Sequence, residues 1–195
     1  ERAMNSLELS DKWIISKANK VAADVTENID KFELGLAAEK IYDFAWSQFC
    51  DWYIEMVKPR LYGEDDEAKN AALYTLTYVL EKILKLLHPF MPFITEEIYS
   101  YLGKEEKIIV AQWPHYDENE NFEKEEQQME IAMEAVRSIR NSRAEMNVPP
   151  SKKATVIVVA DGKVREAIDA AKIYIKTLAS ASEVEFIDES AIPQD

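Results

Sequence analysis

The sequence has little of what a metal site, a phosphate-binding loop or a secreted fold requires. It contains one cysteine, Cys50, two histidines, His88 and His115, and only four glycines. A single cysteine cannot form an internal disulfide, and its use fits a reducing compartment. One cysteine and two distant histidines are too few for a zinc site, so we expect no metal. Neither a glycine-rich phosphate loop nor a nucleophile with an evident base occurs, which favours a binding module over an enzyme.

Long hydrophobic runs are missing as well. No stretch approaches the roughly 18 to 20 apolar residues that a membrane helix needs, and no basic-then-apolar leader opens the chain. We therefore expect a cytoplasmic protein with no membrane partner. Hydrophobic residues make up 47% of the chain, which is typical of a folded protein. The first nine residues begin without an initiating methionine, and we interpret them as the cut edge of a longer protein.

Positive charge is scarce overall but concentrated in one place. The chain has 37 acidic and 23 basic residues, for a net charge of −14, which argues against a nucleic-acid binder that acts through its total charge. Residues 137–153 are the exception, with five bases and one acid. The five bases are Arg137, Arg140, Arg143, Lys152 and Lys153. A local basic patch on an acidic body can still direct a polyanion to one face.

Hydrophobic periodicity predicts helices over most of the chain. Apolar residues recur at spacings of three and four, and this pattern predicts five helices up to Met146. Their approximate ranges are 10–29, 34–58, 68–87, 92–102 and 122–146. Pro59 should end or kink the second helix, and residues 107–113 should form a short extended segment.

The pattern changes after Pro149 and Pro150. Residues 154–160 are rich in β-branched side chains and predict a strand, followed by a helix from about 162 to 178 and a second strand at 184–187. The two strands should be parallel if they pair. The predicted fold is mainly α: an antiparallel helical bundle over residues 1–147, followed by a small α/β (β-α-β) unit over residues 148–195.

The second predicted helix contains a stretch rich in aromatic residues. Tyr42, Trp46, Phe49 and Tyr53 follow one another at steps of four, three and four, which predicts one shared helix face. Such a face is most simply explained as a packed core. Trp52 falls off that face, so its ring is a candidate for a binding surface.

Six motifs, in this order and spacing, closely resemble the C-terminal part of bacterial valyl-tRNA synthetases. The resemblance extends from about residue 7 to residue 187, and the Phe-Cys-Asp-Trp-Tyr order favours the valyl over the isoleucyl and leucyl enzymes. The motifs are DKWIISK (11–17), YDFAW (42–46), FCDWYIE (49–55), HPFMPFITEEIY (88–99), QWP (112–114) and IRNSRAEM (139–146).

The resemblance implies a class I synthetase whose helical bundle binds the anticodon stem and loop of tRNA(Val). It implies a parent enzyme that couples ATP hydrolysis to the charging of tRNA(Val) with valine, using ATP and Mg. The family's His-Ile-Gly-His and Lys-Met-Ser-Lys-Ser signatures are missing here. We therefore expect no catalytic residue and no cofactor in these 195 residues, and a monomer whose partners are the tRNA and the remaining synthetase domains. The alternatives are the corresponding domain of the isoleucyl or leucyl enzyme, or a helical scaffold that binds proteins.

Two groups of side chains suit contact with RNA. Single-stranded loop bases stack on aromatic rings and on guanidinium planes, and arginine can clamp phosphates with two hydrogen bonds. Alternatively, some of these rings belong to the core, and the arginines form ion pairs beside an apolar face. The predicted tRNA-binding residues are Trp46, Phe49, Trp52, Arg137, Arg140, Arg143, Lys152 and Lys153.

Overall fold

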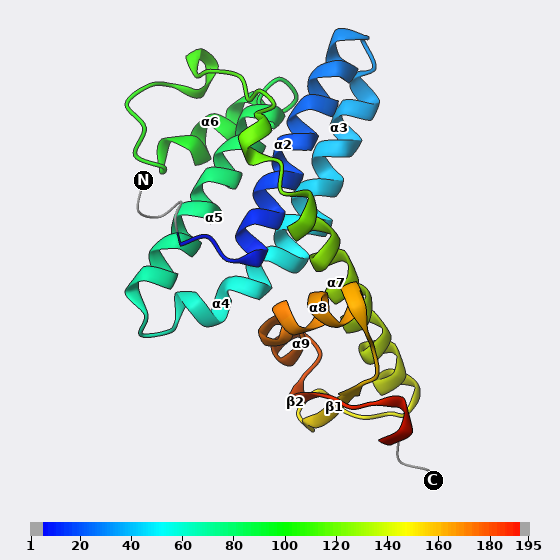
Figure 1. Cartoon of the computed structure of the whole chain (residues 1–195). Helices are drawn as coiled ribbons and strands as arrows, with labels where there is room; N and C mark the ends of the chain where they lie inside the picture. The colour runs from blue at the N-terminus through cyan, green and yellow to red at the C-terminus, as the bar shows by residue number, and fades with distance from the viewer. Residues whose placement is uncertain (1–5, 192–195) are drawn as a thin grey trace. The chain divides into compact units, whose positions relative to one another are not determined.

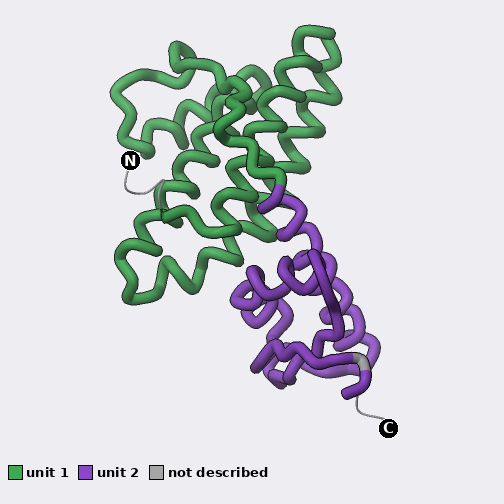
Figure 2. The backbone as a smooth tube through the Cα atoms, viewed as in Figure 1, with its two compact units in different colours: residues 1–123 green, residues 124–195 purple. Residues whose placement is uncertain are grey.

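The computed structural model describes residues 6–191, which divide between residues 123 and 124 into two compact units (Figures 1 and 2). The first unit is helical, and the second joins a long helix to a small parallel sheet. The elements of the first unit are α2 (Leu9–Asp30), α3 (Leu34–Asp43), η1 (Phe44–Ile54), α4 (Glu55–Leu61), α5 (Asp66–Leu87), α6 (Pro92–Ser100) and the short turns η2 (Ile108–Val110) and η3 (Glu118–Glu120). Those of the second, starting at the boundary, are α7 (Glu123–Glu145), β1 (Ala154–Val158), α8 (Gly162–Ala170), α9 (Lys172–Leu178), β2 (Ala181–Phe186) and η4 (Glu189–Ala191).

Helix α2 is the centre of the first unit. It contacts α3, α5, η1 and η3. A reciprocal capping box begins it: the Glu8 side chain accepts from the backbone of Asp11, and the Asp11 side chain accepts from the backbone of Glu8. This satisfies amide groups that have no partner within the first turn. Because several elements cover α2, even its polar residues Ser16 and Asn19 are fully buried.

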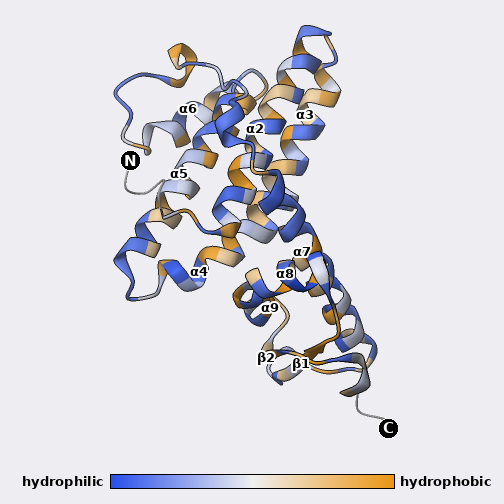
Figure 3. Cartoon of the chain, in the orientation of Figure 1, coloured by the Kyte–Doolittle hydropathy of each residue, from blue (hydrophilic) through white to orange (hydrophobic). Residues whose placement is uncertain are grey.

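Two apolar clusters hold the helices of this unit together. Ala22 and Val25 of α2 meet Ala37 and Ile41 of α3 and Leu86 of α5. A second cluster joins α5 to α6 and η2 through Leu84, Tyr99 and Ile108. The helices carry hydrophobic residues interleaved with hydrophilic ones (Figure 3), as the spacing predicted.

The helical prediction is confirmed in outline and corrected in three places. No strand occurs between residues 34 and 87, all of which the structure describes. The second predicted helix, however, contains eleven residues of π-helix, η1, between α3 and α4. The helical segment also continues through Pro59 and ends at Leu61, three residues beyond the predicted end at about residue 58. Residues 107–113 are extended only in part: the 3₁₀ turn η2 occupies Ile108–Val110, and the flanking Lys107 and Ala111 have extended backbone.

The second unit has the predicted order of strand, helix and strand. β1 and β2 are parallel, with Val156 opposite Val184. The intervening helix is divided at Ala171 into α8 and α9, and β2 begins at Ala181, three residues earlier than predicted.

The boundary between the units differs from the predicted one at residues 147/148. The structure divides the chain at 123/124, which places almost all of α7 with the α/β elements. Two arginines near the end of α7 also hydrogen-bond to backbone carbonyls beyond the helix. Arg140 donates to Leu178 at 2.8 Å, and Arg143 donates to Pro149 at 2.9 Å.

Candidate functional site

The aromatic segment separates into an exposed pair and a buried pair. Tyr42 and Trp46 stack with ring centroids 6.5 Å apart and an interplanar angle of 4°, and they are 63% and 58% exposed. Phe49 and Tyr53 stack at 6.0 Å and 21°, but both are buried, at 6% and 0% exposure. The predicted single face of four rings is therefore wrong.

The π-helix explains this separation. Its i→i+5 hydrogen bonds turn the chain by a smaller angle per residue than the i→i+4 bonds of an α-helix. The step of three residues from Trp46 to Phe49 then covers about two thirds of a turn instead of about five sixths. Phe49 and Tyr53 consequently face the core, while Tyr42 and Trp46 face solvent. π-helical segments are often found at functional sites.

A buried ionic network secures the C-terminal end of this segment. The Asp11 carboxylate is fully buried and accepts hydrogen bonds from the Tyr53 hydroxyl at 2.6 Å and from Arg60 Nη1 at 2.9 Å. Arg60 also donates to the Ala68 carbonyl, from Nη2 at 3.0 Å. Burial and the charge of Asp11 raise the pKa of Tyr53 far above its ordinary value, so the hydroxyl remains a donor. The network thus joins α2, η1, α4 and α5 at one point.

The three predicted stacking residues differ in their access to solvent. Trp46 is exposed, while Phe49 lies in the core and its ring is covered. Trp52 is half-buried and takes part in a further interaction. The structure therefore offers Trp46, stacked on Tyr42, as the most accessible ring. Tyr42 is the residue that sequence reasoning missed, because the four-ring pattern assigned it to the core.

The predicted basic residues all lie in the second unit. Arg137 forms an exposed pair with Glu134 at 3.2 Å. As the bonds to Leu178 and Pro149 show, Arg140 and Arg143 help to hold α7 on the α/β elements. Lys152 and Lys153 are exposed. The arginines thus have structural contacts as well as charge, which was the alternative interpretation of their pattern. The rings and the basic residues belong to different units, so we describe them as two separate surfaces.

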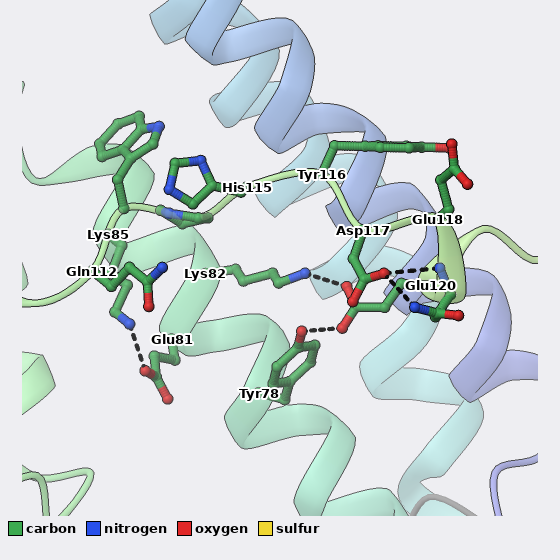
Figure 4. A pocket seen from close by; sticks show the side chains of 13 residues that line it. Tyr78, Glu81, Lys82, Lys85, Gln112, His115, Tyr116, Asp117, Glu118 and Glu120 are labelled. Carbon is green, nitrogen blue, oxygen red and sulfur yellow. Dashed lines mark hydrogen bonds and ion pairs between the residues drawn. The ribbon is translucent and has the colours of Figure 1, made fainter.

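A third feature is an open cleft of about 690 Å³ between α5 and the loop of residues 112–120 (Figure 4). Two lysines and four carboxylates line it, a poor balance for binding RNA. Lys82 and Tyr78 both donate to Glu120, and Lys85 pairs with Glu81 at 2.8 Å. Burial and the bond to Glu120 raise the pKa of Tyr78 far above its usual range. The two bonds to Glu120 fasten the loop to α5, which is a structural role, whereas the Lys85–Glu81 pair lies within α5.

Other hydrogen bonds hold the same loop in place. Asn19 and the backbone of Asp117 exchange two bonds, at 2.7 and 2.8 Å, and Trp113 Nε1 donates to Thr26 at 2.8 Å. His88 Nδ1 lies 2.8 Å from the Thr95 hydroxyl oxygen, seven residues further along the chain. These contacts give structural roles to the QWP and HPFMPF motifs.

Side chains that could bind a metal ion are not clustered in the described part of the chain. Within residues 6–191, no group of three or more histidine, cysteine, aspartate or glutamate side chains could hold a metal ion. Burial, with the neighbouring Asp51 charge, raises the pKa of the Cys50 thiol, which favours the protonated form at neutral pH. In the same described range no helix has both the length and the apolar character needed to cross a membrane.

Exposed stacked rings on a helical unit, together with a locally basic segment at residues 137–153, are features found in RNA-binding modules. Comparison with known proteins identifies the family of the chain. A family described as the anticodon-binding domain of tRNA ligase matches residues 11–158, and the chain belongs to this family.

The relatives are valine–tRNA ligases from several bacteria. The chain is 54% identical to the enzyme of Clostridium perfringens and 52% identical to that of Clostridium acetobutylicum, over 92% of its own length in both cases. It is 40% identical to the enzyme of Enterococcus faecalis over 95% of its length. These matches confirm the resemblance to valyl-tRNA synthetases. The chain spans only about a fifth of each relative's length.

Proposed function

We propose that this chain is the anticodon-binding part of a valine–tRNA ligase and that it binds the anticodon stem and loop of tRNA(Val). The proposal rests chiefly on one observation: nine tenths of the chain matches valine–tRNA ligases at 52–54% identity. The parent enzyme would couple ATP hydrolysis to the charging of tRNA(Val) with valine. ATP and Mg would then bind in the parent's remaining domains, and the chain itself would act by binding alone.

The exposed ring pair supports a contact with loop bases. Trp46 and Tyr42 stack on each other in parallel, which presents a flat aromatic surface of known orientation. A base that stacks on such a ring typically contributes about 1–3 kcal/mol of binding free energy. Trp52, on the same helix, is a second candidate, although its partial burial leaves less of the ring available.

The first experiment compares two RNAs. Filter binding measures the affinity of the chain for tRNA(Val) and for the same tRNA carrying a non-cognate anticodon. The proposal predicts tighter binding to the valine anticodon. Equal affinity for both RNAs would contradict it and would favour the helical scaffold, which has no reason to distinguish anticodons.

The second experiment identifies the ring that meets a base. Trp46→Ala should weaken binding to tRNA(Val) by about 1–3 kcal/mol. Tyr62→Ala is the matched control, because Tyr62 is also an exposed ring of the first unit, at 87% exposure, but lies in the turn after α4. Equal effects of the two substitutions would contradict a specific role for Trp46. Trp52→Ala tests the second ring in the same assay.

A further inference from the structure

Basic residues gather in one part of the chain that extends past the predicted arginine stripe. Residues 137–182 contain nine lysines and arginines and four acids, in a chain whose total charge is −14. Four of these bases, Lys163, Arg165, Lys172 and Lys176, lie on α8 and α9. Sequence reasoning did not single them out, because α8 and α9 read as an ordinary amphipathic helix.

Three lysines from this region line one open cleft of the second unit, with a volume of about 750 Å³. Lys172 and Lys176 are one helical turn apart on α9 and therefore project to the same side. Lys153, which precedes β1, also lines the cleft. Ser182, an exposed residue of β2, is another of its lining residues. Glu183 is the one carboxylate of the lining.

The ion pairs of these lysines are exposed and therefore easily exchanged. Lys176 Nζ lies 3.2 Å from Glu183, with the two side chains 39% and 56% exposed. Lys172 Nζ lies 2.8 Å from Asp169, at 40% and 62% exposure. Exposed pairs of this kind contribute little to stability, because water competes for both partners. By contrast, Lys82 and Glu120 in the first unit are only 11% and 15% exposed, and that pair is fixed.

The Phe186 ring holds two cationic side chains, those of Lys172 and Arg165, near the cleft. Lys172 Nζ lies 4.8 Å from the centroid of Phe186 and the Arg165 guanidinium lies 4.6 Å from it. A cation over an aromatic face is attracted to the ring, which favours these positions of the two side chains. The positive side therefore outweighs Glu183 and Asp169 at this surface.

We propose that the cleft formed by Lys153, Lys172 and Lys176 binds the phosphodiester backbone of RNA. Lysine binds phosphate as a point charge, without reading the base. The α/β unit would then add a sequence-independent contact to the anticodon contact of the helical unit. The inference depends on the proposed function only in taking RNA as the ligand.

The test uses the whole chain and two RNAs, tRNA(Val) and the same tRNA with a non-cognate anticodon. Affinities are measured from 50 to about 300 mM salt. Lys172→Ala and Lys176→Ala should each reduce the affinity for both RNAs alike, by roughly five- to eightfold at 0.1 M salt, and lower the salt slope by about 0.7–0.9. Lys163→Ala is the matched control, because Lys163 is an exposed lysine of the same unit outside the cleft. It should leave the slope unchanged.

A gain of affinity provides the sharper test. Glu183→Gln removes the carboxylate that competes for Lys176, so it should strengthen binding to both RNAs and raise the salt slope. Melting curves identify any variant that fails to fold, and for such a variant Lys→Gln replaces Lys→Ala.

The outcomes separate this inference from the proposed function. Cleft variants that bind like Lys163→Ala, together with an inert Glu183→Gln, would overturn the inference and point to a different occupant such as an acidic protein segment. Anticodon discrimination in the unmodified chain would still stand in that case. Conversely, loss of affinity in the cleft variants without any discrimination between the two anticodons would support the cleft and contradict the proposed function.

Discussion

Replacing Arg60 tests whether the buried network around Asp11 holds the helical unit together. The Arg60 side chain is 8% exposed, and its Nη1 pairs at 2.9 Å with the Asp11 carboxylate, which is fully buried. Arg60→Ala would leave that carboxylate without its cation in a site closed to water. Breaking a buried pair from one side costs about 3–5 kcal/mol. Because the Tyr53 hydroxyl and the Glu8 amide still donate to Asp11, we expect the lower end, about 3 kcal/mol.

The measurement is urea denaturation followed by tryptophan fluorescence. All four tryptophans, Trp13, Trp46, Trp52 and Trp113, lie in residues 1–123, so the signal reports the helical unit alone. Lys40→Ala is the control, because Lys40 and Asp24 pair at 2.7 Å with side chains 43% and 51% exposed. That surface pair should contribute about 0–1 kcal/mol.

A milder change in the same network gives an independent check. Tyr53→Phe removes only one hydrogen bond to the carboxylate and should cost about 1.5–3 kcal/mol. The reasoning would be refuted if Arg60→Ala destabilised the unit no more than Lys40→Ala does. Equal stability would mean that water or another side chain reaches Asp11 and replaces the lost cation.

Three further predictions address pH, the long helix and catalysis. Burial raises the pKa of Glu81, but hydrogen bonds from Lys104 and Lys85 outweigh this and hold it below the ordinary value. Its stabilising effect is therefore complete above the unfolded pKa of about 4.3 and is lost as the pH falls through the lower folded pKa. Glu81→Gln should be less stable than the unmodified chain at pH 7 in urea titrations, and the difference should disappear in acid; a constant difference down to pH 2 would contradict the assignment. Arg140→Ala should lower the melting temperature of the α/β unit, because it removes the bond to Leu178, and should weaken binding to all tRNAs alike; unchanged melting and binding would show that the arginine does neither. The chain should show no valine-dependent pyrophosphate exchange, since the family's two nucleotide-binding signatures are missing from it, and any exchange above background would disprove this.

The order of elements followed from sequence because it depends on local patterns. Apolar spacing placed α5 within two residues of its observed start, Asp66. The β-branched run after Pro150 placed the start of β1 correctly, although the strand ends at Val158, two residues earlier than predicted. The family resemblance was available for a similar reason, since contiguous motifs carry it. Turn chemistry was less predictable: residues 107–113 are apolar enough for a strand, but Ile109 and Val110 are 73% and 71% exposed in a 3₁₀ turn.

The candidate surfaces depended on information that no local pattern contains. Placing the rings on one face assumed 3.6 residues per turn, and the π-helix invalidated that assumption for Phe49. The lysine cleft brings together residues 153, 172 and 176 only because β1 and β2 pair in parallel and α9 leads directly into β2.

The sequence by itself determined the helical class, the family and the absence of the family's catalytic signatures. These properties reside in composition, spacing and contiguous motifs. Only the tertiary structure decided which rings are exposed, that Asp11 is paired with a residue 49 positions away, and which lysines share a cleft. Each of those outcomes depends on contacts between segments distant in sequence, and the free energy of such contacts arises only once the chain is packed.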